Sequence, residues 1–547
     1  MPPALTVRRA TASLAAGALA AALAGCGNVG HSPSQSQIAE SASATGAQVS
    51  GSGGTLIVGM TAANIPALDT VEAGGQGYEG IRFVGNQLYD ALTRYDLDQS
   101  VRIPAIRPAL ASSWSANETA TRWTFHLRPG VTFTDGTPWN AAAAVFNFDR
   151  YLDPTFRWTT PTLIGLAASY VGTVKSARAT GPMTVELTTK VPDSHLPEDI
   201  STAFMASPTA VKEEGVNGFA AHPVGTGPFK FVSEIQGQQL TLARNPHYWR
   251  GAPKLDRLIL KPIPDPSQRI AALRSGAVNW IEYPNPDDIA MLQDEGYQVL
   301  ANSYDHIWPW ILNTAAGPTK DVRVRQAMNY AIDRSAMVNK LLQGTATAAG
   351  QVAPPANAAY QAANDMYTYD PAKARALLAA AGYRHGFSIN VEYPTSGSGN
   401  MIPGPMNQEL QSDLAGVGIK VNLLPIEWAT ELTQFVSGKF PAGVQAENIS
   451  LSFQQEAFWE EAFGSKGPIN AGHYSNPQVD KLLARAQTVV AQGPRDEIYS
   501  RAARIITRDA PWLFVVNDRN PRALAKQVHG FIEPRSWFID LTKTWVG

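Results

Sequence analysis

In the first half of the chain, apolar side chains are spaced as in β-strands. A short apolar run at 55–59 predicts a buried strand. Over 123–127 apolar residues alternate with polar ones and end at Pro129-Gly130, which predicts a half-buried strand followed by a turn. Similar runs at 184–188, 240–242 and 258–260 predict further strands. We therefore expect this half to be rich in sheet.

The second half shows helical spacing with capping residues. Apolar residues recur every three or four positions after Asp321, predicting a helix that Asp321 begins and Gly344 ends. The pairs Asp370-Pro371 and Asn476-Pro477 each place a cap and a first-turn proline before another apolar stripe. A further stripe covers 498–505, and strands are predicted at 387–391 and 420–424. This alternation of strands and helices predicts α/β units.

The N-terminus has the pattern of a secretion signal. Arg8 and Arg9 precede a short apolar run, which ends at Leu23-Ala-Gly-Cys26. The run is shorter than the roughly 20 residues that span a bilayer. The last four residues resemble a bacterial lipobox, and Cys26 is the only cysteine in the chain. We expect 1–25 to be a lipoprotein signal peptide and Cys26 to carry the lipid. The alternative is a plain signal peptide with a chance cysteine.

Composition and charge narrow the class of protein. Residues 26–54 are rich in Ser, Gly, Ala and Gln, which predicts a flexible tether, the alternative being an ordered arm. Hydrophobic residues make up 44% of the chain and charged residues 16%, enough for a large core. The formal net charge of -2 argues against a nucleic-acid partner. We expect a monomer held at the membrane by lipid alone.

Motifs for catalysis and metal binding are missing from the sequence. There is no Gly-x-Ser-x-Gly, Ser-x-x-Lys or His-Glu-x-x-His, and the nine histidines are scattered. Gly225-Thr226-Gly227 precedes Pro228, which has no N–H to donate, so it indicates a structural turn and not a phosphate loop. We expect no enzymatic activity, no cofactor and no metal site.

Three blocks, in order along the chain, carry a resemblance to a known family. They are 88–92 with 108–114, 123–131 and 133–138; 223–229 with 245–249; and 322–333 with 476–480. With these blocks the chain resembles the family 5 extracellular solute-binding proteins of ABC importers, the group of dipeptide-, oligopeptide- and nickel-binding proteins. The resemblance covers essentially everything after the tether.

The resemblance implies a fold and a function. The fold is α/β, a two-lobed periplasmic-binding-protein-like fold of type II, in the large cluster with an extra subdomain in the N-terminal lobe. Residues 55–305 plus 518–547 would form lobe I and 306–517 lobe II. The protein would capture a small solute, a peptide or another small organic molecule, between the lobes. It would then deliver this solute to an ABC permease at the outer face of the cytoplasmic membrane, or in the periplasm.

The resemblance also suggests where the solute binds. Candidate positions lie in the loop after the first strand, after the strand at 387–391, and in the segment that begins near Trp428. The candidate residues are Asn64, Tyr393, Ser396, Gly397, Trp428, Asn448, Ser450, Ser452, Phe453, Gln455 and Glu456. Peptide binders of the family usually carry an aspartate for the peptide's amino terminus, but 449–459 contains none. The segment therefore departs from a standard peptide clamp, and Glu456 is the candidate replacement for the aspartate.

Two other functions stay open at this point. The same fold could serve as a sensor or chaperone-like surface receptor without a transporter of its own. A cell-envelope hydrolase is opposed by the missing nucleophile and metal motifs.

Overall fold

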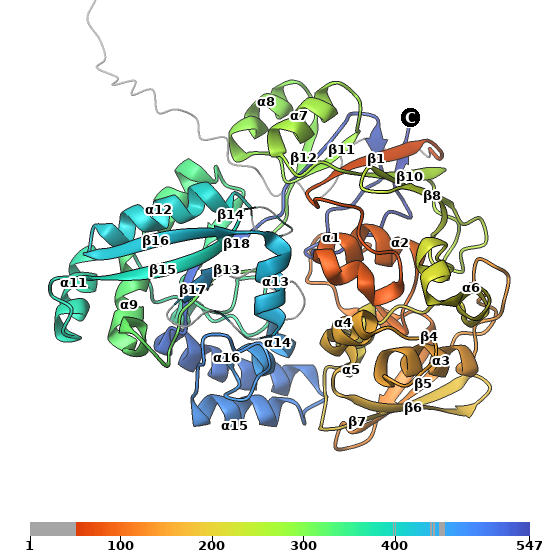
Figure 1. The fold of residues 1–547 in the computed structure, drawn as a ribbon, viewed down its shortest axis with the longest axis horizontal. Coiled ribbons are helices and arrows are strands. Elements are labelled where there is room, and N and C mark those ends of the chain that lie inside the picture. The colour runs from red at the N-terminus through yellow and green to blue at the C-terminus, as the bar shows by residue number, and fades with distance from the viewer. Residues whose placement is uncertain are drawn as a thin grey trace, which may run out of the picture. The chain divides into compact units, whose positions relative to one another are not determined.

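A seven-stranded mixed sheet organises the first part of the chain (Figure 1). The computed structural model describes residues 51–547 except 396, 398, 400, 438–439, 441–443 and 448–454. The strand order is β12-β19-β11-β1-β10-β9-β8, with β1 parallel to both of its neighbours. The strands are β1 (Thr55–Met60), β8 (Phe229–Ile235), β9 (Gln239–Arg244), β10 (Arg257–Pro262), β11 (Trp280–Glu282), β12 (Gln298–Leu300) and β19 (Arg522–Leu524). The strands predicted at 55–59, 240–242 and 258–260 are thus confirmed.

This part of the chain also contains a four-stranded antiparallel sheet. Its order is β4-β5-β7-β6, and α3 and α4 pack with it around a hydrophobic core of their own. The elements are β4 (Ala111–Ala116), β5 (Arg122–Leu127), β6 (Val174–Gly181), β7 (Thr184–Thr189), α3 (Ala141–Leu152) and α4 (Pro161–Val171). The strands predicted at 123–127 and 184–188 are adjacent in this sheet. We call the part built on the seven- and four-stranded sheets lobe I.

A six-stranded sheet organises the other part of the chain, which we call lobe II. Its order is β14-β18-β13-β17-β15-β16. The strands are β13 (Trp308–Ile311), β14 (Ala346–Ala348), β15 (Phe387–Pro394), β16 (Ile419–Ile426), β17 (Val444–Glu447) and β18 (Trp512–Asp518). The helices of this part are α9 (Val322–Ala331), α10 (Arg334–Ala336), α11 (Pro371–Ala380), α12 (Pro403–Ala415), α13 (Trp428–Val436), α14 (Gln455–Phe463), α15 (Pro477–Ala486) and α16 (Gln492–Asp509).

The predicted helix caps are confirmed, but one predicted helix is shorter than expected. Asp321, Asp370 and Asn476 each accept a hydrogen bond from a first-turn backbone N–H. The prediction of one helix from Asp321 to Gly344 was wrong, because α9 ends at Ala331. Ile332 is extended, and the Asp333 side chain caps the new helix α10. A second cap inside the apolar stripe therefore restarts the helix.

The chain passes between the two large sheets twice. It leaves the seven-stranded sheet after β12 and enters the six-stranded sheet at β13. It returns between β18 and β19. The boundaries that we expect near 305 and 518 fall at these two connections, and we keep them as a proposal.

The remaining elements are short or belong to lobe I. They are β2 (Thr93–Tyr95), β3 (Ile106–Pro108), β20 (Val528–His529), β21 (Trp545–Val546), α1 (Tyr78–Gly80), α2 (Asn86–Leu88), α5 (Leu196–Asp199), α6 (Pro208–Ala221), α7 (Pro266–Arg274), α8 (Ile289–Asp294), η1 (Thr70–Gln76), η2 (Ile81–Gly85), η3 (Ile200–Thr202), η4 (Pro286–Asp288), η5 (Pro318–Lys320), η6 (Met337–Leu341) and η7 (Ala362–Asn364). Within the described part of the chain, no helix combines the length and the apolar character that a bilayer span requires.

The turn at Gly225-Thr226-Gly227 has a packing role. A Cβ at Gly227 would lie 2.4 Å from the backbone carbon of Leu88, so only glycine allows this close approach. The Thr226 hydroxyl donates to Asp90 over 2.8 Å. This agrees with the structural turn that the sequence predicts.

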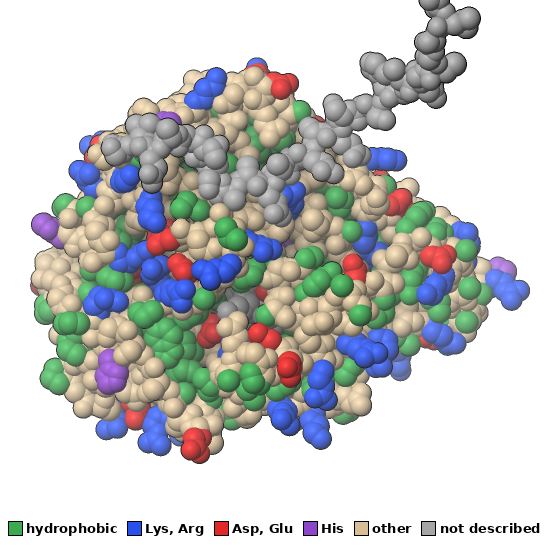
Figure 2. Space-filling model, turned by 180° about the vertical axis from the view of Figure 1, so that it is seen from behind, with side chains coloured by type: hydrophobic (Ala, Val, Ile, Leu, Met, Phe, Trp, Pro, Cys, Tyr) green, Lys and Arg blue, Asp and Glu red, His purple; other side chains and the backbone are tan. Residues whose placement is uncertain are grey.

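On the molecular face in Figure 2, acidic and basic side chains are interspersed.

Candidate functional site

A cavity of about 330 Å³ has walls from both lobes. Lobe I contributes residues at the ends of β1 and β11, and lobe II contributes described residues between β15 and α12 together with the first turn of α12. The lining residues are Thr61, Arg82, Pro264, Pro266, Arg269, Glu282, Tyr283, Asn285, Thr395, Gly397, Gly399, Met401, Ile402, Pro403, Gly404, Pro405, Asn520 and Trp537. This volume lies at the lower end of the range of about 300–1,000 Å³ that is typical of ligand pockets.

Three lining residues have left-handed backbone conformations. The φ angles are 47° at Tyr283, 57° at Met401 and 45° at Asn520. Such conformations are uncommon outside glycine, and they cluster at functional sites, where the surrounding structure holds them in place. Three of the described non-glycine residues with positive φ therefore lie in the cavity wall, one in each lobe and one on the connection that carries Asn520.

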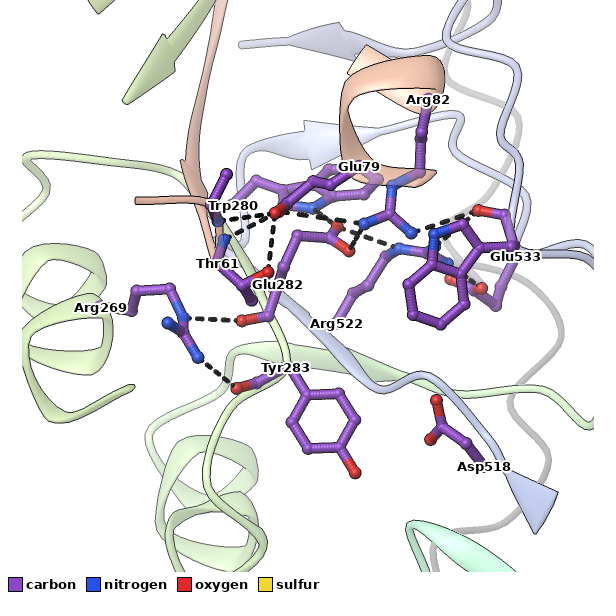
Figure 3. Close-up of polar contacts among 12 residues, drawn as sticks. Thr61, Glu79, Arg82, Arg269, Trp280, Glu282, Tyr283, Asp518, Arg522 and Glu533 are labelled. Atoms are coloured by element: carbon purple, nitrogen blue, oxygen red, sulfur yellow. Dashed lines mark hydrogen bonds and ion pairs between the residues drawn. The ribbon is translucent and has the colours of Figure 1, made fainter. Parts of the chain in front are cut away.

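Glu282, at the end of β11, is the centre of a buried charge network beside the cavity (Figure 3). Its Oε2 lies 2.5 Å from Arg82 Nη2, and its Oε1 accepts from Arg522 Nε over 3.0 Å and from Trp280 Nε1 over 2.6 Å. Burial alone would raise the pKa of Glu282, but Arg82 and Arg522 together hold this pKa below its ordinary value. Glu282 is therefore ionised and fully paired.

The two arginines connect Glu282 to other parts of lobe I. Arg522 also forms an ion pair with Glu533, and Arg82 Nη1 donates to the backbone oxygen of Trp537 over 3.2 Å. Arg82 lies 3.9 Å from Glu79, which accepts from Thr61 N over 2.8 Å and from Ala62 N over 2.8 Å. The network thus fixes the loop that leaves β1 at the edge of the cavity.

Arg269, on α7, holds the strained end of β11. Its guanidinium donates to the backbone oxygens of Glu282 and Tyr283 over 2.9 and 3.0 Å, and also to those of Ile263 and Pro264. These four acceptors keep Arg269 in place and support the left-handed conformation of Tyr283. The charged lining residues Arg82, Arg269 and Glu282 each have partners within the protein, and Arg82 Nε is an atom of this group that has none among the described residues.

Two cavity-lining residues carry buried hydrogen-bond donors that have no acceptor within the described part of the protein. Among the described residues, Asn520 Nδ2 and Arg82 Nε are buried and have no hydrogen-bond acceptor. A buried donor without a partner costs about 1–3 kcal/mol. A carbonyl, hydroxyl or carboxylate oxygen on a bound solute would relieve that cost.

The two connections between the lobes contact each other beside the cavity. The Tyr304 hydroxyl donates to Asp518 Oδ2 over 2.7 Å, and Asp518 Oδ1 accepts from Asn520 N over 2.8 Å. Burial raises the pKa of Asp518 to about 6. A rotation of one lobe against the other would bend the chain here, where Asn520 also lines the cavity.

The residues expected from the sequence are placed in different ways. Gly397 lines the cavity, with its φ at 113°. Asn64 is exposed in the loop after β1, Tyr393 is half-buried in β15, and Trp428 begins α13 with its indole buried. Ser396, Asn448, Ser450, Ser452 and Phe453 lie outside the described residues. Gln455 and Glu456 begin α14, but their side chains are not described. These positions remain predictions.

The sequence reasoning missed most of the described lining. Arg82 and Glu282 are 200 positions apart, and Glu282 and Arg522 are separated by 240, so no local pattern connects them. One signal was available for Asn520. It follows a predicted crossover, and asparagine tolerates the left-handed conformation better than most residues.

Comparison with known proteins places this architecture in a family. The model of the bacterial extracellular solute-binding proteins, family 5, matches residues 105–468. The chain belongs to this family. It is therefore a substrate-binding protein of the kind that serves ABC importers and binds peptides or other small molecules.

Curated relatives of this solute-binding protein span most of its length. Heme-binding protein A of Haemophilus influenzae is 30% identical over 450 residues, which cover 78% of this chain and 82% of the relative. A glutathione-binding protein of Pectobacterium atrosepticum is 31% identical over 464 residues, which cover 82% and 86%.

Solved structures agree on the two-lobed fold. The periplasmic binding protein DppA of Helicobacter pylori, in complex with a peptide, is 25% identical with a TM-score of 0.76, covering 90% of this chain and 98% of that one. A dipeptide-binding protein of a Pseudoalteromonas species shares the fold with a TM-score of 0.77 at 22% identity, covering 90% and 100%. The expected fold class is thus confirmed, and the matched family members are solute-binding proteins and not enzymes.

Proposed function

We propose that this solute-binding protein captures its solute in the cavity between the lobes. The observation that carries the proposal is the composition of the wall, in which both lobes and the connection at Asn520 contribute lining residues. A solute held there contacts both lobes at once, so it binds the closed arrangement better than the open one. The lobes then close around the solute, and the permease receives the closed form.

The solute that we propose is small and rich in hydrogen-bond acceptors. The unpartnered donors Asn520 Nδ2 and Arg82 Nε support this class. The names of the relatives suggest glutathione, heme and short peptides as the first compounds to test. Glutathione fits the proposal well, because it combines two carboxylates with amide carbonyls.

A thermal-shift and calorimetry screen tests this assignment. A solute at 100 times its Kd stabilises the folded protein by about 2.7 kcal/mol. We expect Asn520→Gly to weaken the binding of such a solute by about tenfold, the loss of one hydrogen bond. Asn217→Gly, exposed on α6 and outside the cavity lining, is the matched control. Binding that Asn520→Gly leaves unchanged would place the site elsewhere.

We further propose that the mature chain is a monomer anchored by lipid on Cys26 to the outer face of the cytoplasmic membrane. The tether over 26–54 lets the lobes reach an ABC permease. Labelled palmitate should be incorporated into the native chain in bacteria and not into Cys26→Ser. Equal labelling of the two would contradict the anchor. We also propose that the protein has no catalytic activity, so that a bound solute should be recovered chemically unchanged.

A further inference from the structure

A second contact between the lobes lies at the segment 193–199 of lobe I. The Ser194 hydroxyl donates to the backbone oxygen of Ala486, at the end of α15, over 3.0 Å. Arg495, on α16, donates from Nη1 to the backbone oxygen of Ser194 over 2.7 Å, and its Nη2 lies 3.3 Å from Glu198 Oε1. We call this contact the latch: segment 193–199 with Glu460, Glu461, Ala486, Arg495 and Tyr499.

A hydrogen-bonded chain of three side chains crosses the latch. His195 Nε2 lies 3.0 Å from the Tyr499 hydroxyl, which donates to Glu460 Oε1 over 2.7 Å. His195 is 2% exposed and Tyr499 is fully buried. His195 belongs to lobe I, whereas Tyr499 and Glu460 belong to α16 and α14 of lobe II. The arrangement exists only while the lobes are in contact.

The latch concentrates carboxyl groups with little counter-charge. Lobe I contributes Asp193, Glu198 and Asp199, and α14 contributes Glu460 and Glu461. Among the described groups, the arginine that lowers the pKa of Asp193 and Glu198 is Arg495. Asp496, beside Arg495, adds another acid. His195 is not a counter-charge, because burial holds its pKa well below the ordinary value and leaves the ring neutral. Contact between the lobes therefore crowds carboxylates from both sides.

We propose that the latch is proton-operated, so that uptake of protons by its carboxyl groups favours contact between the lobes. The proposal adds a regulatory step to solute capture and does not depend on which solute is bound. In an ionised latch, repulsion between carboxylates of the two lobes opposes closure. In a protonated latch, the same groups act as neutral hydrogen-bonding partners.

The direction of the pH effect follows from the groups involved. Burial raises the pKa of Glu460 to about 8 and those of Glu198 and Glu461 to about 7, and it also raises the pKa values of Asp193 and Asp199. These groups hold protons in the closed form that they release when the lobes separate, so falling pH favours closure. His195 has the opposite sign, because its proton binds only when the ring leaves the latch, but one histidine offsets only one of the protons that the carboxyl groups take up. Closure should thus be favoured increasingly as the pH falls from 8.5 to 6.0.

The test measures the distance between the lobes in the full mature chain without added solute. Bound solute is first removed by dialysis, and Cys26→Ser removes the native thiol. Spin labels are placed by Val191→Cys and Val490→Cys, positions that are 54% and 43% exposed, one in each lobe. Double electron-electron resonance then measures the distance between the two spin labels. The ratio of short to long distances is determined at pH 6.0, 7.0 and 8.5.

We expect that ratio to fall at least about fivefold between pH 6.0 and 8.5, since the uptake of one proton can change it by tenfold per pH unit. Glu460→Gln combined with Glu461→Gln should flatten the dependence, while Glu295→Gln, an acid outside the latch, should leave it unchanged. His195→Gln removes the group of opposite sign, so the ratio should fall at least as steeply between pH 6.0 and 7.0 as it does in the parent. A ratio that does not change with pH, or a double variant that responds like the parent, would overturn the proposal. Solute binding is measured separately, so a failed latch and a failed solute assignment give different results.

Discussion

Two buried carboxylates, one beside the cavity and one in the latch, have opposite surroundings. Glu282 beside the cavity has a guanidinium on each oxygen, and its pKa lies below the ordinary value. Glu460 in the latch accepts a hydrogen bond from the Tyr499 hydroxyl, and burial raises the pKa of Glu460 to about 8. Glu533, beside Arg522, is intermediate, with a pKa that burial raises to about 7. In these three carboxyl groups the pKa falls as the number of arginines at the carboxyl rises from none to two.

The largest expected effect comes from removing an arginine beside the cavity, and the removal of an arginine from the latch provides the comparison. Arg522→Met leaves Glu282 and Glu533 short of a counter-charge in the interior, and we expect a loss of about 3–5 kcal/mol in the free energy of unfolding. Arg495→Met in the latch should cost about 1 kcal/mol, because its partner Glu198 can take up a proton and become neutral. Urea unfolding at pH 7 measures both. Equal losses would remove the distinction between the two sites.

The pH dependence of stability sharpens the same contrast. Above about pH 5 the unfolded chain has released the proton that the folded protein keeps on Glu460 until about pH 8. The free energy of unfolding should therefore fall as pH rises through this interval. Glu460→Gln should recover about 1–2 kcal/mol of that fall between pH 6 and 8.5. The Glu282→Gln variant should be less stable than the parent at every pH, and its free energy of unfolding should fall with rising pH at the same slope. A parallel slope in Glu460→Gln would argue against a raised pKa at this site.

Asn520, on the connection between the lobes, tests backbone strain instead of charge. Its φ of 45° suits asparagine or glycine and is unfavourable for alanine. Asn520→Ala should therefore lower the free energy of unfolding by about 1–2 kcal/mol more than Asn520→Gly does. Thermal unfolding of the two variants, side by side, measures the difference. If alanine were tolerated as well as glycine, the backbone here would not be constrained.

The smallest effect is expected for an ion pair exposed to solvent. Arg178 and Glu186 lie 3.2 Å apart on neighbouring strands of the four-stranded sheet, with 70% and 20% of their side chains exposed. Arg178→Ala should change the free energy of unfolding by less than about 0.5 kcal/mol. A loss like that of Arg522→Met would show that burial does not explain the comparison.

Much of the secondary structure could be predicted because its causes are local. The alternation over 123–127 and the caps Asp321, Asp370 and Asn476 act within a few residues, and the structure confirms each of them. The helix expected to reach Gly344 failed because Asp333 supplies a competing cap within the same apolar stripe. Of the candidate site residues, Gly397 lines the cavity, and several others lie outside the described residues.

The sequence by itself determined the family and the order of the strands and helices, because landmark motifs and apolar spacing are properties of neighbouring positions. It also carries the prediction of a lipid anchor at Cys26. Only the tertiary structure decided which carboxyl meets which arginine. Glu282 and Arg522 come together across 240 positions, and His195 meets Tyr499 across 304. The pKa of a carboxyl depends on burial and on the charges within a few ångströms, and both are set by packing between distant segments.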